Sequence, residues 1–290
     1  MESGNVSNQE IYKVILVDTD ATILDTFYGK PGDVIKLPKA PNIDKTNENL
    51  AFDDWCCAYE FGVAEDGCYT VTIRDEDIAV GALWSLNTGA AMEITILPFS
   101  GEFKLGFWDP FNENSAYDIE WGDGSVERVI LSGKSDNEIT HIYTEEAERK
   151  ITFTAVGEHY GNNLANGWIK NEDIQDDYEV YMMLNCAFNH PTYIKSIRFG
   201  NFNYSNTKIY LNGSLIPPEC DNNKVVIQEI IIPTLERIDI GVFQSHCGGY
   251  SGYPIQIGMK TWFLKAQYMY NAQSYYYFYE PDIEYCIFGS

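Results

Sequence analysis

The stretch Asp118-Ile119-Glu120-Trp121-Gly122-Asp123-Gly124-Ser125 carries the strongest indication of the fold. It is typical of a strand that runs into a tight Asp-Gly turn. Two further strands are expected downstream, at residues 139–143 and in the alternating segment 150–155. Strands are also expected at residues 92–97, 103–108 and 126–131. Short strands that recur roughly every ten residues indicate a β-sandwich.

The motif Trp121-Gly122-Asp123-Gly124, followed by His141-x-Tyr143 and a closing strand, resembles the PKD-like immunoglobulin-type module. The resemblance covers nearly all of residues 90–157. It implies an Ig-like β-sandwich in which His141 packs or forms a hydrogen bond. Modules of this family occur in exposed, adhesive, multi-domain proteins and are not themselves catalytic, so the resemblance favours display or binding.

Residues 11–86 form an earlier unit, which follows an N-terminal tail of residues 1–10. Strands are expected at residues 11–17, 22–28, 33–38, 69–73 and 79–84, and Phe52 and Trp55 supply bulk for a small core. The order of Tyr28-Gly29-x-x-Gly32-Asp33, the prolines Pro38 and Pro41, Phe52-x-x-Trp55 and Asp75-Glu76-Asp77 resembles a Listeria–Bacteroides repeat of the internalin B type. The resemblance implies a small β-grasp-like fold that serves as a spacer or a protein-binding unit.

Residues 158–290 are less regular. Strands are expected at residues 194–200, 226–233 and 235–243, and their Ile-x-x-Ile-x-(Phe or Ile) pattern resembles the irregular leucine-rich repeats of BspA-type surface proteins. A second β-sandwich with long loops is the alternative. The predicted fold is therefore mostly β, made of tandem small β modules: a β-grasp-like repeat, an Ig-like β-sandwich and an irregular β or LRR-like C-terminal domain.

The C-terminal region is rich in aromatic residues. We interpret this run either as a strand buried on both faces or as a docking surface for a partner subunit or a glycan. If exposed it would be an aggregation hazard, so something should cover it. It is also the best candidate interface of a symmetric homo-oligomer. The predicted partner-binding residues are Tyr268, Tyr270, Tyr275, Tyr276, Tyr277, Phe278 and Tyr279.

Composition limits the classes of partner. The chain of 290 residues carries 43 acidic and 19 basic side chains, a formal charge of −24. Such a chain repels nucleic acid and anionic membranes, so neither is expected as a partner.

There is no apolar run long enough for a transmembrane helix, and the polar N-terminus lacks the features of a secretory signal peptide. The seven cysteines, an odd number without a CxxC pair, indicate buried thiols in a reducing compartment.

The motifs of catalysis and metal binding are missing. The four histidines fit no HExxH pattern, and the neighbours His246 and Cys247 would point to opposite faces of a strand. Asp18, Asp20 and Asp25 lack the glycine and the final glutamate of a calcium loop. We therefore predict no catalytic residue, no metal site and no cofactor, and hence no enzyme.

These observations favour a non-enzymatic structural or adhesive protein displayed on a bacteriophage virion, as a head fibre, capsid decoration or tail-associated protein. A virion protein is made in the host cytoplasm without a signal and then acts outside the cell. Its expected partners are other virion proteins or a host surface protein or glycan. The alternatives are a bacterial cell-surface adhesin whose signal was removed, and an accessory module of a carbohydrate-active enzyme, or a glycosidase itself. The last two would bind glycans through Trp108, Trp168 or Trp262, although core packing is the favoured role of each tryptophan.

Overall fold

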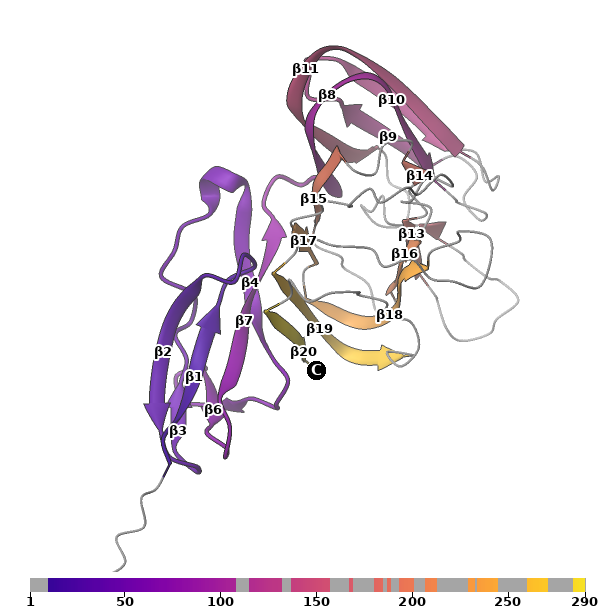
Figure 1. Ribbon diagram of the computed structural model, residues 1–290. Coiled ribbons are helices and arrows are strands. Elements are labelled where there is room, and N and C mark those ends of the chain that lie inside the picture. The colour runs from indigo at the N-terminus through magenta and orange to yellow at the C-terminus, as the bar shows by residue number, and fades with distance from the viewer. Residues whose placement is uncertain are drawn as a thin grey trace, which may run out of the picture.

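The computed structural model describes residues 10–107, 115–131, 137–156, 167–168, 180–184, 187–188, 193–200, 207–212, 229–232, 234–244, 260–270 and 284–289. Within these ranges the chain consists of strands in four sheets, with one short 3-10 helix, η1 (Thr46–Glu48), and no α-helix. Figure 1 shows how the strands are arranged. The prediction of a mostly β protein is confirmed.

The first module, residues 11–86, contains a four-stranded mixed sheet in the order β2-β1-β7-β4. β1 and β2 form an antiparallel hairpin, whereas β7 returns after a long connection and pairs parallel to β1, with Val14 opposite Ile78. β4 then pairs antiparallel to β7. The strands are β1 (Tyr12–Val17), β2 (Ile23–Gly29), β4 (Leu50–Cys57) and β7 (Ile78–Leu86).

A three-stranded sheet covers one face of this four-stranded sheet. It has the order β3-β6-β5, with β3 (Val34–Lys36), β5 (Gly62–Val63) and β6 (Tyr69–Thr72). Val71 of β6 packs with Val14 and Val80 of the larger sheet, and Trp55 joins the same core. Trp55 is buried and its indole nitrogen donates to the carbonyl oxygen of Pro38 at 2.9 Å. The prediction that Trp55 belongs to the core is therefore confirmed.

Residues 92–156 form an antiparallel array of four strands in the order β10-β9-β11-β8. Where four short strands were expected, the structure has two long strands, β8 and β11. Residues 92–97 and 103–108 largely merge into one strand, and so do residues 139–143 and 150–155. Gly101 (φ 120°) and shifts of register near Ala147 let the two long strands stay paired through these irregularities. The strands are β8 (Met92–Phe107), β9 (Ser115–Glu120), β10 (Val126–Leu131) and β11 (Asn137–Val156).

This sheet continues into the third region of the chain. β15 (Ile194–Phe199) pairs antiparallel to β8, and β17 (Glu229–Ile231) pairs parallel to β15. β14 (Ala187–Phe188) pairs with the far end of β8 and brings the sheet to seven strands. Hydrogen bonds between backbones thus cross the expected boundary at residue 157, while the division of the chain into three units stays a prediction.

The remaining strands form a six-stranded sheet that is parallel over five of its members. Each strand of this parallel ladder pairs with one that follows roughly 25 to 30 residues later, a spacing typical of repeat architectures. β12 (Gly167–Trp168) adds one antiparallel edge. The ladder consists of β13 (Val180–Leu184), β16 (Thr207–Asn212), β18 (Leu235–Gln244), β19 (Thr261–Tyr270) and β20 (Tyr285–Gly289).

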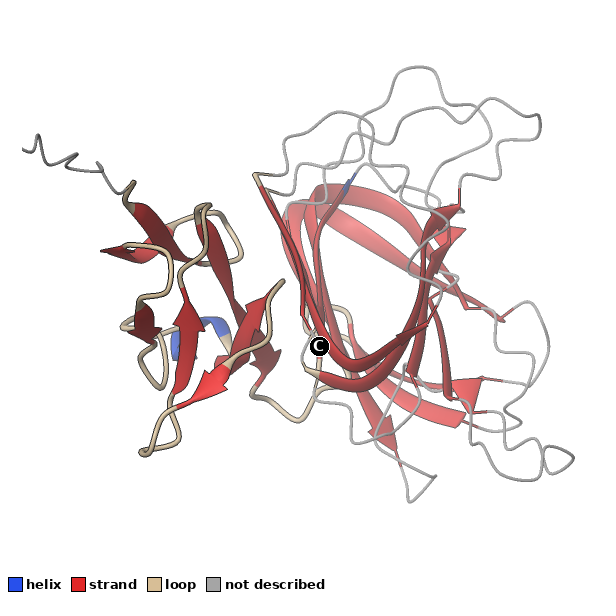
Figure 2. Cartoon of the chain, turned by 90° about the horizontal axis from the view of Figure 1, so that it is seen from below, coloured by secondary structure: helices blue, strands red, loops and turns tan. Residues whose placement is uncertain are grey.

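The end of the parallel ladder lies against the first module. In Figure 1, β19 and β20 approach β7 and β4, and Figure 2 places the C-terminus beside the same module. Phe263 of β19 and Ile287 of β20 share a buried cluster with Val17, Cys56 and Leu83 of the four-stranded sheet. That sheet is therefore covered on one face by its own small sheet and on the other by the C-terminal strands.

Candidate functional site

The predicted partner-binding tyrosines fall only partly within the described residues. Tyr268 and Tyr270 lie at the end of β19, where their backbones pair with Arg237 and Asp239 of β18. Residues 275–279 lie outside the described ranges. Their role in binding a partner stays a prediction.

The first half of the same strand is an internal contact surface. Trp262, Phe263 and Leu264 are all buried, and Phe263 packs into the cluster shared with the first module. A β-carbon added at Gly81 of β7 would lie 2.7 Å from the ring of Phe263, so the ring sits directly on the backbone of β7. From the sequence, a strand was only one interpretation of the aromatic run from Tyr268 onward, so the first half of β19 and all of β20 were missed, although their apolar runs gave a signal.

Cys56 joins β4 to both C-terminal strands. Its sulfur donates to the carbonyl oxygen of Leu264 at 3.2 Å and lies 3.5 Å from that of Ile287. Burial raises the pKa of the Cys56 thiol to about 12, so the group stays protonated and serves as a structural donor. Cys57 and Cys68 are also free and buried, whereas Cys286 is free and exposed.

Lys265 reaches from β19 into an aromatic and acidic recess of the first module. Its ammonium lies 2.8 Å from a carboxylate oxygen of Asp54 and is positioned 4.8 Å from the ring centre of Tyr69 and 5.4 Å from that of Phe61. Phe61 and Tyr69 stack at 4.6 Å. Burial works against the charged amine, but Asp54 outweighs it and raises the pKa of Lys265. This lysine therefore ties β19 to the first module.

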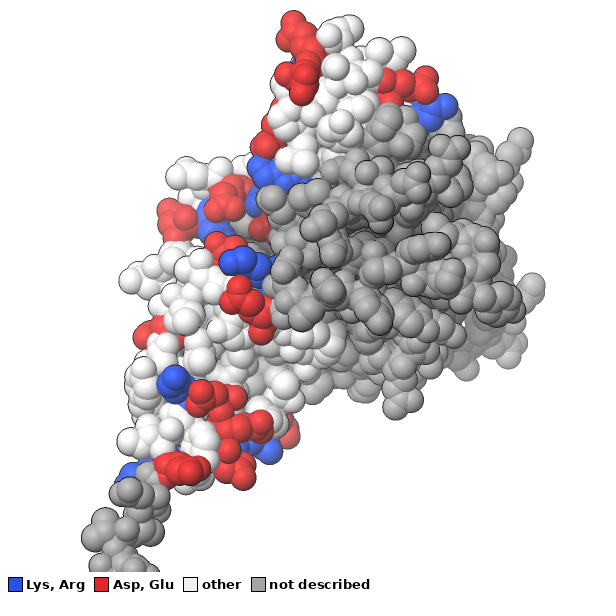
Figure 3. Space-filling model, in the orientation of Figure 1, with Lys and Arg blue, Asp and Glu red and all other residues white. Residues whose placement is uncertain are grey.

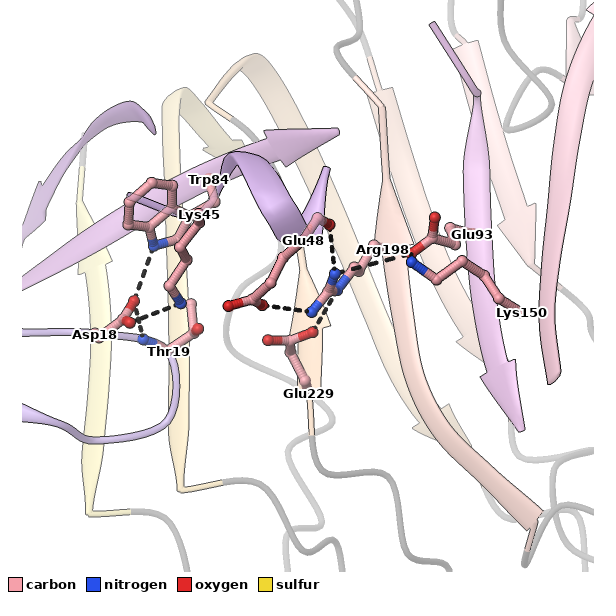
Figure 4. A network of polar contacts seen from close by, with 9 residues as sticks. All are labelled: Asp18, Thr19, Lys45, Glu48, Trp84, Glu93, Lys150, Arg198 and Glu229. Carbon is pink, nitrogen blue, oxygen red and sulfur yellow. Dashed lines mark hydrogen bonds and ion pairs between the residues drawn. The ribbon is translucent and has the colours of Figure 1, made fainter. Parts of the chain in front are cut away.

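A second polar contact, the Arg198 cluster, joins all three regions of the chain (Figure 4). Arg198 of β15 bonds Glu229 of β17 at 2.6 Å, and it reaches the carbonyl oxygen of Glu48 at 3.0 Å and its carboxylate at 3.2 Å. Burial disfavours the charged guanidinium, yet Glu229, Glu93 and Glu48 raise the pKa of Arg198. The cluster thereby ties η1 of the first module to the seven-stranded sheet.

Glu93 of β8 extends the Arg198 cluster into the second unit. Its carboxylate is buried, with Lys150 Nζ at 3.0 Å and Arg198 Nη1 at 3.8 Å. The Oε1 atom of Glu93 makes no hydrogen bond of good geometry. The cost of burying its charge is therefore offset mainly by the positive charges of Lys150 and Arg198. All these carboxylates are engaged by cations of the chain itself.

The Trp-Gly-Asp-Gly turn is held in place by side chains of β11. His141 stacks on the buried Trp121 with ring centres 4.5 Å apart, and its Nε2 lies 2.7 Å from Asp123 Oδ2. The hydroxyl of Tyr143 donates to the carbonyl oxygen of Trp121 at 2.9 Å. Burial alone would raise the pKa of Asp123, but hydrogen bonds from Ser125 and His141 hold it well below its ordinary range. His141 thus packs and bonds, as the resemblance implies.

Other expected site residues give no open site within the described ranges. Trp262 is 1% exposed, so its suggested use as a glycan platform is wrong. Trp108, His246 and Cys247 lie outside the described residues, as does the side chain of Trp168. In the part of the chain that the structure describes, no group of three His, Cys, Asp or Glu side chains is placed to hold a metal ion.

The surface of the described residues is markedly acidic. On the face shown in Figure 3, carboxylates gather over the lower part of the first module, with few basic groups among them. In the described ranges no helix has the length and apolar character that a membrane crossing requires.

Comparisons with protein families, curated proteins and solved structures gave no match for this chain.

Proposed function

We propose that the chain is a non-enzymatic structural or adhesive protein displayed on a virion, as a head fibre, capsid decoration or tail-associated protein. The observation that carries the proposal is the docking of the parallel ladder onto the first module. Two groups that could otherwise form a reactive site, Lys265 and Cys56, are used in that docking, while Arg198 and Glu93 are engaged in the cluster that ties η1 to the seven-stranded sheet. Parts of the chain that are held together in this way form a rigid body, which suits a protein that presents its outer surface to a partner.

The topology supports the resemblances on which this proposal rests. A mixed sheet with its two central strands parallel, as in β2-β1-β7-β4, is compatible with a β-grasp-like module. The parallel ladder is compatible with an LRR-like region, in which each repeat adds one strand to a continuous sheet. The closed Trp121–His141 turn is compatible with the PKD-like resemblance. Modules of all three kinds belong to exposed proteins.

Location on the particle can be tested directly. Antibodies raised against the purified chain should label intact particles of the phage that carries its gene, seen by immuno-electron microscopy. Particles that stay unlabelled, while the chain is found in the wall fraction of uninfected bacteria, would favour the adhesin instead. Counting free thiols separates the same two cases, because the adhesin predicts disulfides among the seven cysteines.

Assembly through the aromatic C-terminus needs a separate test. Deleting residues 266–290 would also remove β20, which packs on the first module, so substitution is the cleaner change. We expect light scattering to show an oligomer that becomes monomeric when Tyr275, Tyr276, Tyr277 and Tyr279 are replaced by serine. Tyr28→Ser, at an exposed position of β2, is the control. A monomer in every case would refute assembly through these residues.

A further inference from the structure

A second polar group of Figure 4 lies within the first module, at the end of the β1–β2 hairpin. Asp18 follows β1, and its carboxylate is 5% exposed; the side chain of Lys45, from the loop before η1, is 11% exposed. Lys45 Nζ lies 2.6 Å from Asp18 Oδ2. By contrast, the ion pair of Lys36 with Asp66 on the same module leaves both side chains about half exposed, at 53% and 48%.

The other oxygen of Asp18 is held by two N–H donors. The indole Nε1 of Trp84 donates to Oδ1 at 2.9 Å, and the backbone nitrogen of Thr19 donates to the same atom at 2.8 Å. The ammonium of Lys45 also lies 5.0 Å from the ring centre of Trp84. The amine therefore contacts one carboxyl oxygen while two fixed donors polarise the other, the arrangement that stabilises a tetrahedral intermediate of acyl transfer.

We propose that Lys45 and Asp18 condense to an intramolecular amide. In the first step one proton passes from Nζ to Oδ2 along their 2.6 Å contact, which leaves a neutral amine beside a carboxylic acid. Nζ then bonds to Cγ, and the charge that develops on Oδ1 is stabilised by Trp84 Nε1–H and Thr19 N–H. The Cγ–Oδ2 bond breaks, and Oδ2 leaves as water with the second proton from Nζ. Nothing is oxidised or reduced.

Because the fold holds Lys45 and Asp18 in place, the condensation can proceed without a separately activated carboxyl group. The two groups come from different parts of the fold and are fixed by β1, β7 and η1, which removes the entropic cost of bringing them together. The link joins the hairpin turn to the loop before η1 and, unlike a disulfide, is indifferent to reducing conditions.

Mass spectrometry of the full, denatured chain tests the proposal. We expect the wild-type mass to be lower than the sequence mass by one water molecule, and digestion to yield one branched peptide that contains both Asp18 and Lys45. Lys45→Arg keeps the charge but cannot form this amide, so it should show the full sequence mass. Wild-type chain at full mass overturns the proposal whatever the variant does. A water loss that persists in Lys45→Arg also overturns it, because dehydration at an Asp-Gly site would then explain the loss.

Discussion

The thiol of Cys56 donates to the carbonyl oxygen of Leu264 at 3.2 Å, across 208 residues of sequence. The donor belongs to β4 in the first module, and the acceptor belongs to β19 in the parallel ladder. Around this bond lie Phe263 and Ile287, which fill the cluster between the two parts. The N-terminal module is therefore packed onto the last strands of the chain, which makes it part of one body rather than a freely projecting unit.

Thiol reactivity should report this packing. Cys56 is buried with its pKa raised to about 12, so almost no thiolate forms near neutral pH and alkylation should occur only after unfolding. Cys286, which is exposed, should react in the folded protein. Timed iodoacetamide labelling followed by peptide mass spectrometry measures both. Equal labelling rates for Cys56 and Cys286 in the folded chain would contradict the docking described above.

Gly81→Ala should loosen the contact between β7 and β19. The added β-carbon would lie 2.7 Å from the Phe263 ring, and overpacking of this kind costs about 1–3 kcal/mol. Phe263→Leu removes the opposing ring atoms, so the double variant should lose less stability than the sum of the two single variants. Urea denaturation of all four proteins completes the cycle. Strict additivity would show that the two residues do not touch.

Arg198→Met should destabilise the chain by about 3 kcal/mol, because it leaves Glu229 without its cation and Glu93 with Lys150 alone, in a largely enclosed position. Arg128→Met is the matched control. Arg128 also binds a carboxylate bidentately, that of Asp118, but its side chain is mostly exposed and its loss should leave the denaturation midpoint almost unchanged. Similar midpoints for the two variants would argue against the Arg198 cluster as a stabilising contact.

Asp123→Asn should have an effect that depends on pH. The folded-state pKa of Asp123 lies below its ordinary value of 3.8, so its contacts stabilise the folded chain above that value and lose this contribution as the pH falls below it. The difference in melting temperature between wild type and variant should be largest near neutral pH and should shrink in acid. Melting curves across this range provide the measurement, and a difference that stayed constant would refute the assignment.

Local patterns predicted most of the first module. β1, β2, β6 and β7 fall within one or two residues of the expected strands, except that β7 runs on to Leu86, because each combines β-branched residues with clear turn signals. β4 was expected only as a source of core residues. Its centre carries Asp53 and Asp54, which interrupt the apolar pattern, and these carboxylates in fact bind Thr234 and Lys265 of the C-terminal region. A local pattern holds no information about such distant partners.

Elsewhere, periodicity located strands but not their extent or pairing. It divided β8 and β11 in two because their irregularities break the alternation near Gly101 and Ala147. It located β15 and β18 but missed β20 and the first half of β19, where residues 261–264 are all buried and so do not alternate. The members of the Arg198 cluster lie far apart in the sequence, from Glu48 to Glu229, and they belong to no recognisable sequence motif. Only the assembled sheets bring them together.

The order in which the chain is synthesised gives the docking of β19 and β20 a further consequence. Val17, Cys56 and Leu83 leave the ribosome well before Phe263 and Ile287, which cover them. Until β19 and β20 have been synthesised this apolar face lacks their cover, and a chain truncated before β20 never acquires all of it. Chains truncated before β20 should therefore be recognised by chaperones or aggregate.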